Sequence, residues 1–285
     1  MLRAAAIQLN STEDYARNRE RAEALVREAA AGGAELVVLP EKWNRLGESA
    51  AMAAGAEPLD GPATEWARAL ARELGLDLVA GSITERAGDA NHNTAVHVDP
   101  DGEVRAAYRK LHLFDVEVEG TSYRESDVES PGQEIVDSQL ADGTGLGLTI
   151  CYDVRFPALY RALAESGASF LTVPSAFTKK TGEAHWHTLL RARAIETGCF
   201  VFAAAQAGMH ENKRETFGHS LIIAPWGEIL AEGGAEPGVF LARIDPARVE
   251  TARKAVPSLQ HGRRFSVVDA KAGPDHLHLV RGSSA

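Results

Sequence analysis

The sequence predicts an α/β fold built from mixed β-sheets with helices packed on them. Short apolar runs alternate with longer amphipathic stretches, and an Asp-Gly turn joins two consecutive strand-like runs. The alternation is typical of parallel strands, whereas the tight turn requires an antiparallel pair. The 285 residues contain no linker-like segment and no repeat of roughly 20 to 50 residues. We therefore expect one domain, 1–285, with a core at about 2–255 and a C-terminal tail, 256–285, that is partly flexible or part of an interface.

In the first half, the hydrophobic periodicity predicts a strand, a helix and a buried strand, which together form a β-α-β unit. A second helix and a third strand follow. The next two strands are joined through Asp99-Pro100-Asp101-Gly102, which favours a tight hairpin. In chain order these elements are residues 3–9, 15–31, 35–39, 64–74, 76–83, 93–98 and 104–108.

The second half repeats the alternation of strand and helix. We expect strands at 145–150, 169–173 and 200–205, with helices at 157–166 and 182–197 between them. A hairpin is expected around Pro225-Trp226-Gly227-Glu228. Trp226 is interpreted as a packing residue of that hairpin, and Cys199 as a core residue beside an apolar run.

Composition excludes several classes of partner. The formal net charge of −10 argues against nucleic acid or an anionic membrane surface, because both favour a basic face. Two cysteines far apart in sequence provide no disulfide framework, which suits a reducing compartment. No run approaches the roughly 18 apolar residues of a membrane span, and the first residues do not resemble a secretory signal. We expect a cytoplasmic protein.

Three reactive side chains lie one or two residues beyond the ends of predicted strands. Glu41 follows the strand at 35–39, Lys110 follows that at 104–108, and Cys151 follows that at 145–150. Chemistry collects at the carboxyl ends of strands in α/β folds, so we expect these residues to meet. Each also has a structural interpretation: Glu41 as a helix cap, Lys110 as a solvated charge, and Cys151 as a buried core thiol.

Together the three side chains could attack a carbonyl group. Cys151 would bond to the carbon, while Glu41 would accept the thiol proton and return it to the departing amine. Lys110 and the backbone N–H of Tyr152 would stabilise the oxyanion. Because Cys151 precedes a predicted helix, we also expect the free N–H groups of the first helical turn to lower the pKa of its thiol.

These residues lie in blocks that resemble those of the nitrilase superfamily of carbon–nitrogen hydrolases. The blocks are Leu39-Pro40-Glu41, YRKLHLFD at 108–115 and CYDVRFP at 151–157, in the order of the family. The resemblance implies an α-β-β-α sandwich, a homodimer or larger homo-oligomer, and hydrolysis of a small amide through a thioester without metal or cofactor. It also implies a second glutamate between the Lys and Cys blocks; Glu125 occupies that place and would orient Lys110 and the substrate.

Within the superfamily, the chain resembles amidases that act on amides of 2-oxo acids. The segments that carry this resemblance are 173–178, 181–186, 190–196 and 218–220. The stretch AAAQAGMH at 203–210 is more similar to deaminated glutathione amidases than to ω-amidases for 2-oxoglutaramate or 2-oxosuccinamate. Arg155 would bind the 2-oxoglutaryl carboxylate, with Phe177 and Thr181 as further substrate contacts. Alternatively, Arg155 pairs with Asp153 or another carboxylate and merely fixes the turn.

Two other functions remain open. A papain-like hydrolase would pair Cys151 with a histidine such as His112 or His219. A silent binding protein of the same fold would need no triad at all. No metal is expected, because His185 and His187 point to different faces of a helix and no neighbouring Cys or carboxylate completes a ligand set. The segment 114–130 could be a lid, an interface or both.

Overall fold

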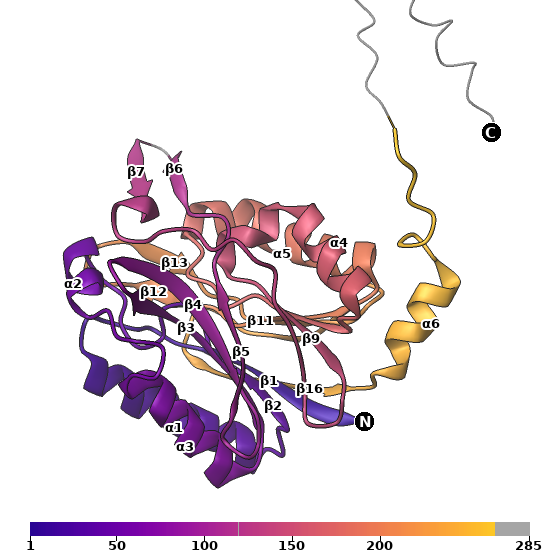
Figure 1. The fold of residues 1–285 in the computed structure, drawn as a ribbon, viewed down its shortest axis with the longest axis horizontal. Coiled ribbons are helices and arrows are strands. Elements are labelled where there is room, and N and C mark those ends of the chain that lie inside the picture. The colour runs from indigo at the N-terminus through magenta and orange to yellow at the C-terminus, as the bar shows by residue number, and fades with distance from the viewer. Residues whose placement is uncertain (119, 266–285) are drawn as a thin grey trace, which may run out of the picture.

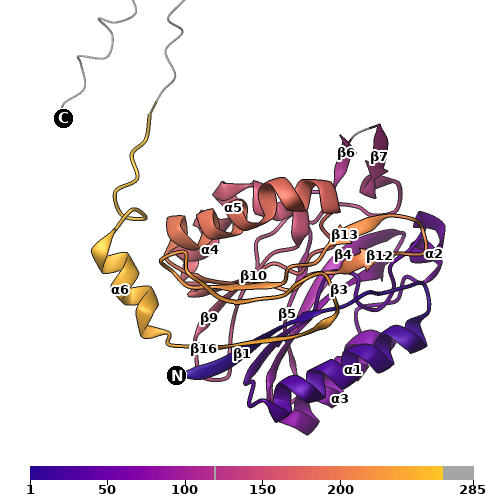
Figure 2. The same cartoon turned by 180° about the vertical axis from the view of Figure 1, so that it is seen from behind.

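Two six-stranded sheets form the centre of the molecule in a computed structural model, which describes residues 1–118 and 120–265. The first sheet has the order β16-β1-β2-β3-β4-β5 and the second β15-β14-β11-β10-β9-β8. Helices α1 and α3 cover the outer face of the first sheet, and α4 and α5 cover that of the second (Figure 1, and from behind in Figure 2). The layers therefore follow the order α-β-β-α, as the family resemblance implied.

The first sheet is mixed. Its strands are β1 (Leu2–Gln8), β2 (Leu36–Val38), β3 (Asp77–Ala87), β4 (Ala90–Val98), β5 (Val104–Arg109) and β16 (Gly238–Ile244). β1, β2 and β3 are parallel, whereas β16, β4 and β5 each join by an antiparallel pairing. The predicted hairpin at Asp99-Pro100-Asp101-Gly102 is confirmed between β4 and β5. Because two antiparallel steps separate β5 from β3, β5 runs in the direction of β2.

The second sheet has a parallel centre and antiparallel edges. Its strands are β8 (Asp137–Gln139), β9 (Gly145–Leu148), β10 (Phe170–Thr172), β11 (Phe200–Ala203), β14 (Leu221–Ile223) and β15 (Ile229–Glu232). β10 pairs in parallel with both β9 and β11. The predicted hairpin around Trp226 is the antiparallel connection of β14 and β15. Trp226 is 59% exposed, so its interpretation as a packing residue is wrong within this chain, whereas Cys199 is buried as predicted.

The helices are α1 (Tyr15–Ala31), α2 (Ser49–Ala54), α3 (Pro62–Leu74), α4 (Pro157–Ser166), α5 (Lys179–Thr197) and α6 (Ala247–Ala255). The bounds of α1 and α4 agree with the prediction. α1 begins after Asp14, whose carboxylate accepts the N–H groups of Ala16 and Arg17. α5 begins three residues before its predicted start at Gly182. This glycine lies inside the helix, at a point where a Cβ would be 2.3 Å from the ring of Phe217.

Two hydrophobic cores correspond to the layers. One lies between the outer face of the first sheet and helices α1 and α3, with Trp43 and Trp66 in ring contact. The other fills the space between the sheets and beneath α4 and α5. No helix within the two described stretches is long and apolar enough to cross a membrane. Of the predicted tail, residues 256–265 follow α6, and the part from 266 onward lies outside the described residues.

Candidate active site

The active-site side chains come together where strands of the two sheets end opposite each other. They are Glu41, Lys110 and Cys151. Glu41 lies just past β2, Lys110 follows β5, and Cys151 follows β9 of the second sheet. Their exposed fractions are 4%, 2% and 7%. Nζ of Lys110 is 3.0 Å from Oε1 of Glu41, and the Glu41 carboxylate is near enough to the Cys151 thiol to raise its pKa. The strand ends thus bring the three groups together, and none is a solvated surface charge.

Close backbone packing holds Glu41 in place. Gly81 of β3 has φ +52°, and a Cβ there would lie 2.0 Å from the carbonyl oxygen of Pro40. Only glycine allows β3 to approach the strand end so closely. The next residue, Lys42, adopts a left-handed φ of 54°, which turns the chain away after Glu41. Oε2 of Glu41 also accepts the N–H of Ala176 at 2.7 Å, so the carboxylate is held from both sheets.

The chain around Cys151 is strained and tightly bonded. Cys151 has a left-handed φ of 47°, and its N–H donates to the carbonyl of Pro174 at 2.9 Å. Buried Asp153 fixes the turn by accepting the Ile150 N–H at 2.9 Å and the Tyr108 hydroxyl at 2.7 Å. The predicted turn into a helix is confirmed: a 3-10 turn, Cys151–Arg155, follows the thiol, and α4 starts at Pro157.

The thiol is held in its neutral form. Burial and the adjacent Glu41 carboxylate both raise the pKa of Cys151 well above its ordinary value, and Lys110 lowers it by less. The expectation that helical N–H groups would lower this pKa is therefore wrong. The physical reason is that a thiolate here would be a second negative charge in a desolvated space beside a carboxylate.

Lys110 is an ammonium between two carboxylates. Its Nζ donates to both oxygens of Glu125, at 2.9 and 2.8 Å, as well as to Glu41. Burial opposes its charge, but the carboxylates of Glu125 and Glu41 outweigh burial and raise the pKa of Lys110. Burial likewise opposes the charge of Glu125, yet Lys110, the Asn93 amide and the Phe114 N–H together lower the pKa of Glu125 to about 2. Glu125 is thus placed where the resemblance implied.

Asn93 was not expected in the site. Its Nδ2 donates to Oε1 of Glu41 and to Oε1 of Glu125, both at 2.8 Å, so one amide connects the two carboxylates. It lies within β4, and its carbonyl accepts the N–H of Lys110 at 2.8 Å. In the sequence it is only a polar residue at the start of the predicted strand 93–98, and such residues are common on solvated sheet faces.

A second buried ion pair, Lys42 with Glu129, also lines the site and was not expected. Nζ of Lys42 donates to the Glu129 carboxylate and, at 2.8 Å, to Oγ1 of Thr84. Burial raises the pKa of Glu129, Lys42 acts against this, and the nearby Glu125 adds to it. The left-handed turn at Lys42 directs its ammonium into the same space as Glu41, a consequence of backbone conformation that spacing does not reveal.

The triad opens onto a cavity of about 370 Å³. This volume lies in the range of about 300 to 1,000 Å³ that is typical of small-molecule sites. The segment 114–130 forms one wall through the hairpin β6 (Asp115–Val118) and β7 (Thr121–Arg124), followed by the 3-10 turn Glu125–Asp127. In Figure 1 this hairpin rises above the body of the molecule. The segment therefore contributes to the cavity wall, and its use as a lid, an interface or both stays a prediction.

Phe177 and Thr181, the predicted substrate contacts, line this cavity, and so does Tyr152, whose backbone N–H is expected to face the oxyanion. Arg155 is not among the lining residues: its Nη1 lies 3.3 Å from Nδ1 of His185, and its guanidinium carbon lies 5.2 Å from the centre of the Phe177 ring. The Asp153 carboxylate is hydrogen-bonded to Tyr108, His112 and Ile150, and no bond to Arg155 is found among the described residues. The predicted alternative of an ion pair between Arg155 and Asp153 is therefore wrong.

The histidines considered as partners of Cys151 are bonded elsewhere. Nδ1 of His112 lies 2.7 Å from Oδ1 of Asp153, and Nδ1 of His219 lies 3.2 Å from Glu232. Neither lines the cavity. His210 does line it, but its two ring nitrogens contact the carbonyl of Ser11 and the hydroxyl of Thr216. A Cys–His pair is therefore not formed within the described part of the chain.

Comparison with known proteins identifies the family. Residues 3–254 match the sequence profile of the carbon–nitrogen hydrolases. The chain belongs to the carbon–nitrogen hydrolase family. It is 44% identical to the deaminated glutathione amidase of Synechocystis sp. strain PCC 6803 over 264 residues, which cover 90% of this chain and 97% of the relative. The chain is thus a hydrolase of carbon–nitrogen bonds.

Solved structures of carbon–nitrogen hydrolases have the same fold. The NitFhit protein of C. elegans superposes with a TM-score of 0.85 at 38% identity; the match covers 92% of this chain but 65% of NitFhit. Saccharomyces cerevisiae Nit3, a member of branch 10 of the nitrilase superfamily, superposes with a TM-score of 0.84 at 32% identity, covering 93% and 97% of the two chains. The α-β-β-α layers are those of the nitrilase superfamily.

Proposed function

We propose that the protein is an amidase that hydrolyses deaminated glutathione to 2-oxoglutarate and cysteinylglycine. The observation that carries the proposal is the convergence of a buried thiol, a carboxylate and an ammonium on one cavity. These groups are the nucleophile, the proton carrier and the oxyanion partner that amide hydrolysis through a thioester requires. The substrate is suggested by the relative that shares 44% identity over nearly its whole length.

In the first half-reaction, Glu41 takes the thiol proton while the sulfur of Cys151 attacks the amide carbon. The carbonyl electron pair moves onto oxygen, where Lys110 and the N–H of Tyr152 stabilise the charge. The carbon–nitrogen bond then breaks, and the amine leaves with the proton that Glu41 returns. The thiol itself is neutral at rest, so deprotonation and attack must be coupled.

In the second half-reaction, water replaces the amine. Glu41 accepts a proton from the water as its oxygen attacks the thioester, and Lys110 again faces the oxyanion. The carbon–sulfur bond breaks, Cys151 recovers its proton from Glu41, and the acid is released. Glu125 acts through Lys110: two hydrogen bonds hold the ammonium, so we assign it as a positioning residue.

Recognition of the acyl half involves the wall formed by Phe177 and Thr181. Oγ1 of Thr181 lies 2.7 Å from Oγ1 of Thr178, which places both hydroxyls at the cavity. The Arg155 guanidinium lies over the Phe177 ring, and we propose that it binds the 2-oxo carboxylate when substrate enters. The contact with His185 is its resting position.

The test measures release of 2-oxoglutarate from deaminated glutathione and from 2-oxoglutaramate in parallel, with Cys151→Ala as the blank. Faster turnover of deaminated glutathione, abolished in the blank, supports the proposal. Preference for 2-oxoglutaramate would instead indicate an ω-amidase. Release from neither, with substrate still bound in an equilibrium assay, would indicate a silent binding protein. Arg155→Lys should raise KM for both substrates if the acyl carboxylate is its ligand.

Assembly, compartment and domain extent stay predictions. The molar mass from light scattering after gel filtration tests the prediction of a homodimer or larger homo-oligomer. The cytoplasmic location is measured by fractionation of the source cells. A single cooperative unfolding transition of the full chain, followed by two optical probes, would support one domain.

A further inference from the structure

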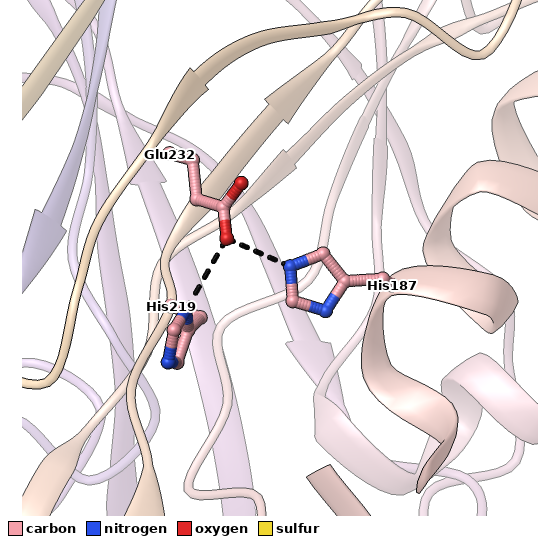
Figure 3. A group of neighbouring side chains, drawn as sticks. All are labelled: His187, His219 and Glu232. Carbon is pink, nitrogen blue, oxygen red and sulfur yellow. Dashed lines mark hydrogen bonds and ion pairs between the residues drawn. The ribbon is translucent and has the colours of Figure 1, made fainter. Parts of the chain in front are cut away.

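Two histidines and a glutamate converge away from the catalytic cavity. Oε1 of Glu232 lies 2.9 Å from Nε2 of His187 and 3.2 Å from Nδ1 of His219, and the three atoms all lie within 4.8 Å of one another. Figure 3 shows both imidazole rings directed at the same carboxylate oxygen. None of the three lines the catalytic cavity. The cluster is therefore separate from the proposed amidase chemistry.

The three residues come from separate elements and are held by their surroundings. His187 lies on α5, Glu232 ends β15, and His219 precedes β14. The ring of His219 stacks on that of Phe217, with centres 4.3 Å apart, and its carbonyl accepts the indole N–H of Trp186. His219 also has a left-handed φ of 52°. Such backbone strain at a non-glycine residue persists where the surroundings hold the side chain in one direction.

The expectation of no metal rested on the pair His185 and His187, which do diverge on the helix. It considered only neighbours in sequence. The fold brings the imidazole of His219, 32 residues along the chain, and the carboxylate of Glu232, 45 residues along, beside His187. These two groups complete the ligand set that neighbours in sequence do not provide.

Two imidazoles and one carboxylate are a zinc ligand set. Zinc binds such atoms at about 2.0 to 2.2 Å in a tetrahedron, so any two ligand atoms lie about 3.3 Å apart. The two contacts to Glu232, at 2.9 and 3.2 Å, are close to that spacing, and the ligand nitrogens of the two histidines lie within 4.8 Å of each other. The side chains are 31 to 39% exposed, which leaves access for the ion and a fourth position for water. Neutral imidazoles can bind once each carries its proton on the other ring nitrogen.

We infer that His187, His219 and Glu232 form a binding site for a divalent transition-metal ion, zinc by preference. The bound ion joins α5 to the β14–β15 hairpin. It replaces the two hydrogen bonds that link His187 and His219 to Glu232. α5 begins just after Phe177 and Thr178, which line the catalytic cavity. The site thus fixes the helix that follows one wall of the cavity, without taking part in the reaction.

The test is a zinc titration of the full chain by calorimetry, with Cys151→Ala as the background so that the catalytic thiol cannot bind the ion. Saturable binding of one zinc per chain is expected. In that background, His187→Ala and the near-isosteric Glu232→Gln should each weaken binding about tenfold or more. His185→Ala is the matched control, because His185 is an exposed histidine on the same helix but outside the cluster. It should leave the affinity unchanged within about twofold.

Two further readouts keep the result clear if a variant folds poorly. Zinc should raise the melting temperature of the background protein and not that of the Glu232→Gln form, since only a ligand bound to the native state stabilises it. X-ray absorption should show nitrogen and oxygen neighbours at about 2.0 to 2.2 Å and no sulfur at about 2.3 Å. Absence of stoichiometric binding, equal loss in His185→Ala, or a zinc–sulfur distance would each overturn the inference.

Discussion

Replacing Glu125 with glutamine tests the role of the second carboxylate. Glu125 accepts two hydrogen bonds from Lys110, one from Asn93 and one from the N–H of Phe114. Glutamine keeps the shape but removes the charge. Glu41 is then the remaining carboxylate bonded to Lys110, so the ammonium should move toward Glu41 and weaken it as a proton acceptor. We expect kcat to fall while KM changes little.

The magnitude follows from the contacts. A hydrogen bond to a charged group contributes about 1.5 to 3 kcal/mol, and about 1.4 kcal/mol changes a rate tenfold. Loss of the Lys110 interaction therefore predicts a decrease in kcat of roughly 10- to 150-fold. The pKa of Glu125 is lowered from 4.5 to about 2, so its stabilising contribution is fully present above pH 4.5 and is lost as pH falls toward 2. Across the neutral range the ratio of wild-type to variant kcat should not depend on pH.

Steady-state release of 2-oxoglutarate between about pH 6 and 9 measures this ratio. Asp115→Asn is the matched control: Asp115 belongs to the same hairpin, is exposed, and accepts the N–H of Ser126. Its kcat should stay within about twofold of wild type. Equal losses in Asp115→Asn and Glu125→Gln would mean that the hairpin, and not the charge on Lys110, sets the rate. An unchanged kcat in Glu125→Gln would refute the positioning role.

Three further substitutions test the neighbouring contacts. Asn93→Ala removes the amide shared by the two carboxylates and should lower kcat by roughly 10- to 100-fold in the same assay, with KM within about threefold. Gly81→Ala should lower the melting temperature or prevent folding, because its Cβ would clash with the carbonyl of Pro40 at a positive φ; calorimetry measures this. Glu41→Gln should abolish turnover yet speed alkylation of Cys151 by iodoacetamide at pH 8, since removing the carboxylate lowers the pKa of the thiol. Slower alkylation would contradict that charge effect.

The triad could be predicted because strand ends are visible in sequence. β2, β5 and β9 each appear as a short strand-like run with a reactive residue just beyond its end, and the packed sheets bring those ends together. Helices α1 and α4 were predicted to the residue because each has a clear start, Asp14 for α1 and Pro157 for α4. Strand ends and helix starts are therefore predictable because each depends on a few neighbouring residues in the sequence.

Features that depend on contacts between distant segments were missed. β8, β12 (Ala207–Met209) and β13 (Glu215–Phe217) have three residues each and, unlike the equally short β2, are not buried along their whole length, so no buried apolar run marks them. β16 forms because it pairs with β1 at the other end of the chain. Asn93 belongs to the site only through the register of β4 with the segment that carries Lys110. No spacing rule contains that register.

The raised pKa of the thiol is compatible with catalysis once charge is followed through the proposed attack. At rest, the negative charge is on Glu41, 3.0 Å from Nζ of Lys110, and the thiol is neutral. When the proton passes from sulfur to Glu41 and the electron pair passes to the carbonyl oxygen, the negative charge leaves Glu41 and appears on the oxyanion. The net charge of the buried site stays constant, and Lys110 faces the negative group before and after the step. A free thiolate, the costly species in this desolvated space, need never accumulate.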